Sequence, residues 1–278
     1  MELTRTRDAL PLVIWRESSP STNAELRELV AAGDGVLPHG TLLATANQTA
    51  GRGRLYRGWV TPPDLAIAAS LLVRDFGSGS GDELGPGWLS LMAGTAMAGA
   101  LQRHFGEGMR VGVKWPNDVH VRNEDDAMAG RPGLKLVGIL SEMLRDGAFV
   151  VGTGVNLLLP QEELPTERAT SLLVAGADVG GAVTLADDAG RDLADAVLAD
   201  YATAMLRLVE LARTDSAAVR ARVARASLTI GAEVRVHLPG GEIVDGRARA
   251  LAPDGSLIVD LPTGGVLEVS AGDVEHLR

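Results

Sequence analysis

Hydrophobic residues gather in short runs through the first 160 residues of the chain. Five of these runs are almost wholly apolar and are separated by glycine, proline or charged residues; they cover 41–46, 65–74, 111–121, 134–144 and 149–159. Runs of this length and composition are typical of strands buried on both faces. We therefore expect a central sheet covered by helices.

Helical periodicity occurs in three other places. Thr22 and Glu25 match a capping box, which predicts a helix that begins at about Asn23. Residues 88–106 are rich in alanine and are expected to form a second helix. A third, amphipathic helix is predicted within 184–211, where apolar residues recur every three or four positions, namely Leu193, Val197, Tyr201, Met205 and Leu208.

The pattern changes after Ser227. Five short alternating segments follow, and Gly-containing turns such as Pro-Gly-Gly and Pro-Asp-Gly separate them. About fifty residues of strands and tight turns predict a small β-barrel. The chain is therefore expected to have an α+β fold with two domains, at 1–226 and 227–278.

Composition excludes several classes of function. The formal net charge of -10 argues against a nucleic-acid-binding surface, because such surfaces are rich in Lys and Arg. The chain has no cysteine and no HExxH pair, so disulfides, thiolate sites and a histidine-rich metal site are not expected. No apolar run reaches the roughly 18 residues that a membrane span needs. We expect a soluble, cytoplasmic protein.

One segment of this acidic chain is basic. Residues 48–63 read QTAGRGRLYRGWVTPP, with three arginines, no acid and several glycines. The guanidinium groups suit phosphate, and an indole suits a purine base, so five residues form a candidate phosphate and base site: Gln48, Arg52, Arg54, Arg57 and Trp59. The segment is not a Walker A loop, because GxxxxGK[ST] is missing, and it is not GxGxxG, because Tyr56 stands at the third glycine position. The alternative is a solvated surface loop.

Two further segments carry polar groups at the ends of predicted elements. Ser21, Thr22 and Asn23 offer hydroxyl and amide groups that suit a small polar head group such as a urea, although Thr22 alone would also serve as a helix cap. The string KWPND at 114–118 places Lys114 at a strand end, where a carboxylate can meet a phosphate. The alternative for this string, a surface strand end with a packed Trp, leaves the lysine unexplained.

Glycines mark the last two segments, KLVGILSE (135–142) and GTGVN (152–156). Glycine in adjacent strands lets a flat or chain-like ligand lie against a sheet, and Asn156 is a candidate partner for phosphates or their metal. Each segment taken singly also fits an ordinary buried strand.

In order and approximate spacing, these strings resemble the biotin protein ligase family. The similarity runs from about Ser19 to the string ATSL at 169–172, and the GDV…HLR ending at 272–278 is also similar. The resemblance implies a class II synthetase-like catalytic domain with a central mixed sheet, followed by an SH3-like β-barrel. It implies that biotin and ATP, with Mg²⁺, form biotinyl-5′-AMP. The biotinyl group then passes to a lysine of a biotin carboxyl carrier protein or domain of an acyl-CoA or pyruvate carboxylase.

The resemblance also implies residue roles. Biotin is assigned to Ser21, Thr22, Asn23, Gln48, Arg52, Gly53, Arg54 and Lys114. ATP and the adenylate are assigned to Arg54, Arg57, Trp59, Asn117 and Asn156, with Trp59 against adenine. Catalysis is assigned to the cations Lys114, Arg52 and Arg54, because negative charge develops on phosphate oxygens. No residue is assigned to a metal. Tyr56 departs from the glycine that is frequent at its position.

Other expectations follow from the same resemblance. The few residues before Ser21 are too short for an N-terminal helix-turn-helix, so a monofunctional ligase is expected. Segment 51–59 is expected to be mobile without ligand and to order over the adenylate, where it would exclude water. Two rival functions remain, a lipoate ligase and a non-catalytic biotin-binding protein. The oligomeric state and the role of the barrel stay open.

Overall fold

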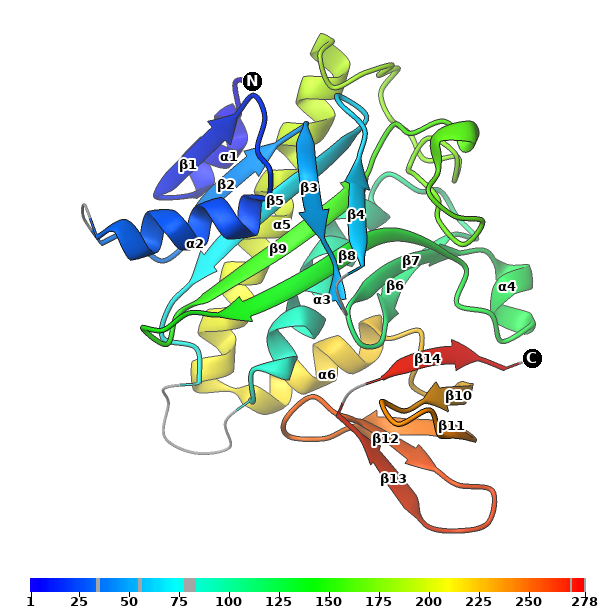
Figure 1. Ribbon diagram of the computed structural model, residues 1–278. Helices are drawn as coiled ribbons and strands as arrows, with labels where there is room; N and C mark the ends of the chain where they lie inside the picture. Colours follow the sequence, from blue (N-terminus) through cyan, green and yellow to red (C-terminus); the bar gives the residue numbers. More distant parts are fainter. Residues whose placement is uncertain (34–35, 55–56, 78–83, 271, 278) are drawn as a thin grey trace.

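A seven-stranded mixed sheet forms the centre of the molecule (Figure 1). The computed structural model describes residues 1–33, 36–54, 57–77, 84–270 and 272–277. The strands follow the order β1 (Leu12–Arg16), β2 (Thr41–Thr45), β5 (Ala66–Val73), β9 (Phe149–Asn156), β8 (Leu134–Met143), β7 (Asp118–Arg122) and β6 (Arg110–Lys114). Strands β1 and β2 are parallel, and every other neighbouring pair is antiparallel. The predicted central sheet is therefore confirmed.

Helices pack on one face of this sheet, where most of the core lies. They are α1 (Thr4–Ala9), α3 (Gly87–Gln102), α5 (Asp188–Thr214) and α6 (Ser216–Ala226), and α3 and α5 pack against each other. The five apolar residues predicted to face the core from α5 are all buried. The opposite face carries α2 (Thr22–Ala32) and the hairpin of β3 (Gln48–Arg52) and β4 (Gly58–Thr61), as Figure 1 shows. This second face carries two of the polar segments that the sequence singled out, residues 21–23 and the arginine-rich segment 48–63.

A buried carboxylate ties α1 to α5. Asp195 accepts hydrogen bonds from the backbone N–H groups of Arg5 (2.8 Å) and Thr6 (2.9 Å) and from the Thr6 hydroxyl (2.7 Å). These donors lie in the first turn of α1, where backbone N–H groups have no partner within the helix. Asp195 therefore acts as a cap supplied from a distant helix.

The C-terminal region forms a second, antiparallel sheet. Its strands are β10 (Glu233–His237), β11 (Ile243–Leu251), β12 (Leu257–Asp260), β13 (Val266–Val269) and β14 (Asp273–His276), in the order β13-β12-β11-β10-β14. They correspond to the five alternating segments of the sequence, so the small β domain is confirmed.

The two parts of the chain are in close contact. Leu228 donates its backbone N–H to Val113 of β6 (2.8 Å), so the chain extends along the central sheet before it enters the second domain. The indole N–H groups of two core tryptophans donate to carbonyl oxygens of the β11–β12 turn, Trp88 to Pro253 (2.9 Å) and Trp115 to Gly255 (3.1 Å). The boundary at 226/227 remains a prediction.

Three local expectations differ from the structure. Helix α2 begins at Thr22 with Ser21 as its cap, and Glu25 contacts Arg16 and Ser19 instead of completing a capping box. The run 111–121 is a hairpin of β6 and β7 instead of one strand, and the cis Trp115–Pro116 bond lies in its turn. Residues 123–133, whose sequence NEDDAMAGRPG predicts a turn, contain a short helix, α4 (Glu124–Met128). In the described part of the chain, no helix is long and apolar enough to cross a membrane.

Candidate active site

A cavity of about 890 Å³ lies on the sheet face opposite α3 and α5. Its walls come from the start of α2, the β3–β4 hairpin, the turn between β6 and β7, and strand β14 of the small domain. All the residues that the sequence singled out for biotin or the adenylate line it: Ser21, Thr22, Asn23, Gln48, Arg52, Gly53, Arg54, Arg57, Trp59, Lys114, Asn117 and Asn156. Segments up to 135 residues apart in sequence therefore meet in one site.

The floor of the cavity is a row of cross-strand neighbours. Ala68, Gly154, Gly138, Asp118 and Lys114 stand opposite one another in β5, β9, β8, β7 and β6. A Cβ atom at Gly154 would lie 2.2 Å from the Trp59 indole, and one at Gly138 would lie 2.6 Å from it. The indole therefore rests directly on the two glycines, which explains why the strands need glycine here.

A second row holds the side chain of Asn23. Ser70, Gly152 and Leu140 are cross-strand neighbours in β5, β9 and β8, and a Cβ atom at Gly152 would lie 2.1 Å from Asn23 Oδ1. The Asn23 amide donates to Leu140 O (3.1 Å) and to Glu142 Oε2 (2.7 Å), and its oxygen accepts from the Ser70 hydroxyl (2.6 Å). Asn23 is thus fixed at one end of the cavity.

Helix capping leaves the side chain of Thr22 available to this end of the cavity. Ser21 Oγ accepts from Ala24 N (3.4 Å), so the cap is the residue before Thr22. Thr22 donates its backbone N–H (2.9 Å) and its hydroxyl (3.2 Å) to Gln48 Oε1. The polar groups of α2 and β3 therefore form one hydrogen-bonded wall.

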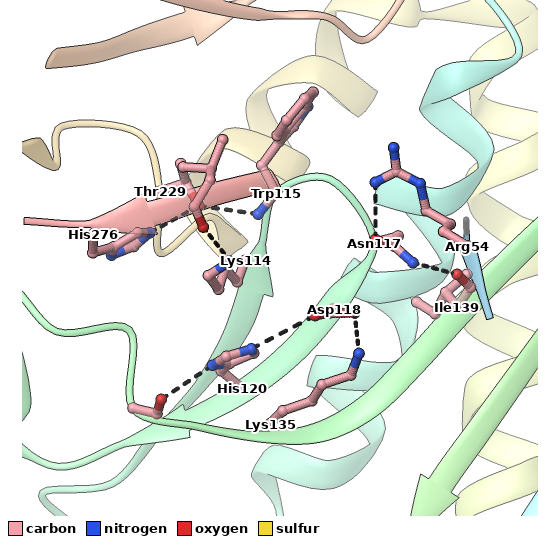
Figure 2. A network of polar contacts seen from close by, with 12 residues as sticks. Arg54, Lys114, Trp115, Asn117, Asp118, His120, Lys135, Ile139, Thr229 and His276 are labelled. Atoms are coloured by element: carbon pink, nitrogen blue, oxygen red, sulfur yellow. Dashed lines mark hydrogen bonds and ion pairs between the residues drawn. The ribbon is translucent and has the colours of Figure 1, made fainter. Parts of the chain in front are cut away.

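The three arginines of the hairpin lie in different surroundings. Arg54 donates to Asn117 Oδ1 (3.3 Å), and Asn117 in turn donates to Ile139 O (2.6 Å), as Figure 2 shows. Arg57 forms an ion pair with Asp273 of the small domain. Arg52 is exposed at the end of β3. Tyr56 lies outside the described residues.

Lys114 occupies the far end of the floor row. Its ammonium group donates to Val274 O of β14 (2.7 Å). Burial lowers the pKa of Lys114, while the nearby Asp118 carboxylate raises it and Lys135 lowers it further. Strand β14 thus supplies an acceptor that holds this half-buried amine in place.

Asp118 is the carboxylate between the two lysines (Figure 2). Its Oδ1 lies 2.7 Å from Lys135 Nζ, and its Oδ2 lies 3.9 Å from His120 Nε2. Burial raises the pKa of Asp118, but the His120 ring and the Lys135 ammonium outweigh burial and lower this pKa to about 2. Asp118 is therefore ionised at neutral pH and balances part of the positive charge.

Lys135 reaches the cavity because of a β-bulge. Val119 pairs with Val137 and His120 pairs with Lys135, which leaves Leu136 as an extra residue in β8. A bulge shifts the alternation of side chains, so Lys135 and Gly138 share the cavity face although their spacing is odd. The Lys135 ammonium lies 5.6 Å from the Trp59 ring centroid. Sequence alternation gave no signal for this lysine.

Strand β14 is a wall that sequence reasoning missed. Asp273, Val274, Glu275 and His276 all line the cavity. The Thr229 hydroxyl accepts from Trp115 N (3.0 Å) and lies 3.3 Å from His276 Nε2. Burial lowers the pKa of His276 to about 4, and the positive charge of Lys114 contributes. The only available signal was the similarity of the chain ending to one family.

Asn156 lines the cavity, but its amide group is engaged. It is 2% exposed, and its Nδ2 donates to Thr170 O (3.0 Å). Among the described residues, no group of three His, Cys, Asp or Glu side chains is placed to hold a metal ion. The described residues of the site are rich in cations and amides, and they include no such group of ligands for a divalent ion.

Comparison with known proteins identifies this arrangement. Residues 18–157 match the model of the Biotin/lipoate A/B protein ligase family, and residues 229–277 match the Biotin protein ligase C terminal domain. The chain is 37% identical over 270 residues to the biotin--[acetyl-CoA-carboxylase] ligase of Mycobacterium tuberculosis, covering 95% of this chain and 90% of that protein. The chain belongs to the biotin protein ligase family.

The chain is also similar to other members of this family. The bifunctional ligase/repressor BirA of Bacillus spizizenii is 30% identical over 60% of this chain and 47% of its own length. Among solved structures, the biotin protein ligase of Aquifex aeolicus in complex with biotin and ATP has a TM-score of 0.67 at 23% identity, covering 97% of this chain and 100% of that one. The ligase of Leishmania major with biotinyl-5-AMP has a TM-score of 0.55 at 22% identity, covering 94% and 99%. These two structures share the biotin protein ligase fold with this chain.

Proposed function

We propose that the protein is an ATP-dependent biotin protein ligase. It converts biotin and ATP to biotinyl-5′-AMP and pyrophosphate, and it then transfers the biotinyl group to one lysine of a biotin carboxyl carrier domain. The observation that carries the proposal is the floor row, which leads from the small residues under Trp59 to Lys114 within one cavity. A volume of about 890 Å³ suits an elongated ligand of this size.

The biotin head group is assigned to the α2 end of the cavity. Asn23, Thr22 and Gln48 are hydrogen-bonded to one another or to the sheet, so their polar atoms are held in fixed positions. A cyclic urea has two N–H donors and one carbonyl acceptor, and this wall offers both kinds of partner. The biotin chain then runs along the floor toward Lys114.

The first chemical step joins two anions. The biotin carboxylate attacks the α-phosphate, the bond to the leaving oxygen breaks, and pyrophosphate departs. Lys114 is the catalytic cation in this assignment, because a partly desolvated ammonium group stabilises charge more strongly than a fully exposed one. Arg52, Arg54 and Arg57 of the hairpin line the same cavity, and we assign them to the phosphate oxygens.

In the second step, the ε-amine of the carrier lysine attacks the carbonyl carbon of the adenylate. A new amide bond forms, and AMP leaves with the bonding electron pair. The adenylate is a mixed anhydride that water also attacks, so the site must limit its contact with solvent. The ion pair of Arg57 with Asp273 joins the hairpin to the small domain, and both residues line the cavity.

The small domain has a role in this scheme. Val274 O holds the Lys114 ammonium, and Thr229 binds the backbone N–H of Trp115, the residue that follows Lys114. The barrel thus sets both the side chain and the backbone of the catalytic lysine. Trp59 and Asn117 are assigned to the adenylate, while Asn156 supports the floor through Thr170.

Mg²⁺ is assigned to the substrate. The described residues contain no three-ligand cluster, and Asp118 is already paired with Lys135. Mg²⁺ commonly binds through phosphates and water with few protein ligands. We therefore expect it to arrive as MgATP. ATP-dependent chemistry and a chain without cysteine favour the cytoplasm.

The test is a mass measurement on a carrier domain. The protein is incubated with ATP, Mg²⁺, biotin and the carrier domain of a biotin-dependent carboxylase, and the expected result is a mass increase of one biotinyl group. A carrier whose acceptor lysine is replaced by arginine is the control. Modification with lipoate but not with biotin would overturn the assignment in favour of a lipoate ligase. An unchanged carrier, despite tight biotin binding, would indicate a non-catalytic protein.

A further inference from the structure

The amide group of Asn23 has a defined orientation. Both hydrogens of its Nδ2 are used, one by Leu140 O (3.1 Å) and one by Glu142 Oε2 (2.7 Å). Its Oδ1 accepts from the Ser70 hydroxyl (2.6 Å). Turning the amide over would place its oxygen against two acceptors that have no hydrogen to give. The oxygen of Asn23 is therefore held as an acceptor at this end of the cavity.

The hydroxyl groups around Asn23 support the same orientation. Ser70 Oγ lies 2.8 Å from Thr22 Oγ1 and 2.6 Å from Asn23 Oδ1. Ser70 has one hydroxyl hydrogen, and Asn23 Oδ1 can only accept, so that hydrogen belongs to Asn23. Thr22 keeps its own hydrogen for Ser70 or for Gln48. The Ser70 hydroxyl on the sheet is thus the donor to Asn23 Oδ1.

Glu142 is the charged member of this group. One of its carboxylate oxygens accepts from Asn23, and the other lies 3.7 Å from Arg27 Nη1 on α2. Gly152 lies beneath the Asn23 side chain and leaves no room for a Cβ atom. Asn23 is consequently confined from below by glycine and from the side by Leu140, Glu142 and Ser70.

We propose that Glu142 and Ser70 are positioning residues that present Asn23 Oδ1 to an N–H donor of the bound head group, and so select a cyclic urea. The inference rests on the proposed function, because it assigns the head group to this end of the cavity. A carbonyl oxygen has two lone pairs, and Ser70 uses one. A head group without an N–H at this place leaves the second lone pair buried and unpaired, which costs binding energy.

The first test compares biotin binding by three variants with that of the parent protein. Glu142→Ala removes the acceptor for Nδ2, and the dissociation constant for biotin is expected to rise about tenfold, as for loss of one hydrogen bond to a charged group. Glu142→Gln keeps an oxygen acceptor, and the rise should be about threefold or less. Glu28→Gln, on the exposed side of α2, is the matched control and should bind biotin as the parent does.

A paired variant distinguishes positioning from a general effect on folding. Asn23→Asp places a carboxylate beside that of Glu142 and should weaken biotin binding more than Glu142→Ala. In the double variant Asn23→Asp/Glu142→Gln, the new glutamine can donate to the new aspartate, so part of the lost affinity should return. In Glu142→Ala the KM for biotin should change by a larger factor than the KM for ATP or kcat at saturating biotin, and the control Glu28→Gln should leave all three near the parental values.

The readout is calorimetric binding of biotin and of biotin methylated at a ureido nitrogen. The parent protein should prefer biotin over at least one methylated form, and Glu142→Ala should lose most of that preference. Parental affinity in Glu142→Ala, or no recovery in the double variant, would overturn the inference. The proposed function can fail while the positioning inference holds. This is the result if the parent and variant proteins show the expected biotin affinities but the parent transfers no biotin to a carrier.

Discussion

Replacing Asp118 by asparagine tests the charge balance at Lys114, the proposed catalytic lysine. The Asp118 carboxylate lies 2.7 Å from Lys135 Nζ, stands opposite Lys114 in the sheet, and has a pKa of about 2 instead of 3.8. At 1.36 kcal/mol per pKa unit, this difference corresponds to about 2 kcal/mol of folding free energy. Asparagine cannot carry the charge, so Asp118→Asn should lower the free energy of unfolding at pH 7 by about 2 kcal/mol.

The pH dependence follows from the direction of the shift. A carboxyl group whose pKa is lower in the folded protein stabilises it above the unfolded pKa, and this stabilisation is lost as the pH falls through the folded pKa. The gap between parent and Asp118→Asn should therefore be full above about pH 4 and should shrink toward pH 2. Urea unfolding followed by circular dichroism measures the gap at each pH. Asp245→Asn, at an exposed ion pair with Arg235, is the control with a small change.

The same substitution should change activity in a specific direction. Asp118 raises the pKa of Lys114, so its loss should lower that pKa further. The alkaline limb of the pH profile for biotin-dependent pyrophosphate release should then move to lower pH. Equal urea midpoints for parent and variant at pH 7, or a gap that persists unchanged at pH 2, would refute the charge-balance account.

Three further substitutions test packing. Tyr201→Phe removes a buried hydroxyl without a hydrogen-bond partner in the described residues, so calorimetry should show no loss of stability and a gain of about 1 kcal/mol; a clear loss would contradict this. Gly154→Ala puts a Cβ atom 2.2 Å from the Trp59 indole, and KM for ATP or biotin should rise at least tenfold while the melting temperature changes little. Asp195→Ala removes the cap of α1 and should cost about 2 kcal/mol in urea unfolding, whereas Asp195→Asn should cost less.

Local sequence patterns predicted much of the fold. The apolar runs, the periodicity of α5 and the alternating C-terminal segments each report on burial within a few neighbouring residues, and the structure confirms them. The polar strings were also visible, because three arginines in an acidic chain and a KWPND turn are unusual. The structure places all of the assigned residues in one cavity.

Features that depend on pairing between distant segments were not visible. Alternation along 134–144 predicts that Lys135 and Gly138 face opposite sides, and only the register of β7 with β8 reveals the bulge between them. The β14 wall depends on how the barrel docks on the central sheet, which no local pattern encodes. The cap of α2 differed by one residue, because both Ser21 and Thr22 are good cap residues and only packing selects between them.

The glycines of β8 and β9 also show what the sequence could not predict. Glycines at 138, 152 and 154 predicted a surface against which a flat group lies. In the structure, that surface is occupied by side chains of the protein itself, the Trp59 indole and the Asn23 amide. The three glycines do leave space on the sheet for other groups. The sequence alone did not identify the Trp59 and Asn23 side chains that occupy this space.

Biotin-dependent release of pyrophosphate from ATP by Lys114→Ala tests the central claim most directly. Lys114 is the half-buried cation at the end of the floor row, and loss of such a group typically costs about 10²- to 10³-fold in rate. The variant should release pyrophosphate and label a carrier at least about 10²-fold more slowly than the parent, with an unchanged circular dichroism spectrum. A parental rate in Lys114→Ala would contradict the account.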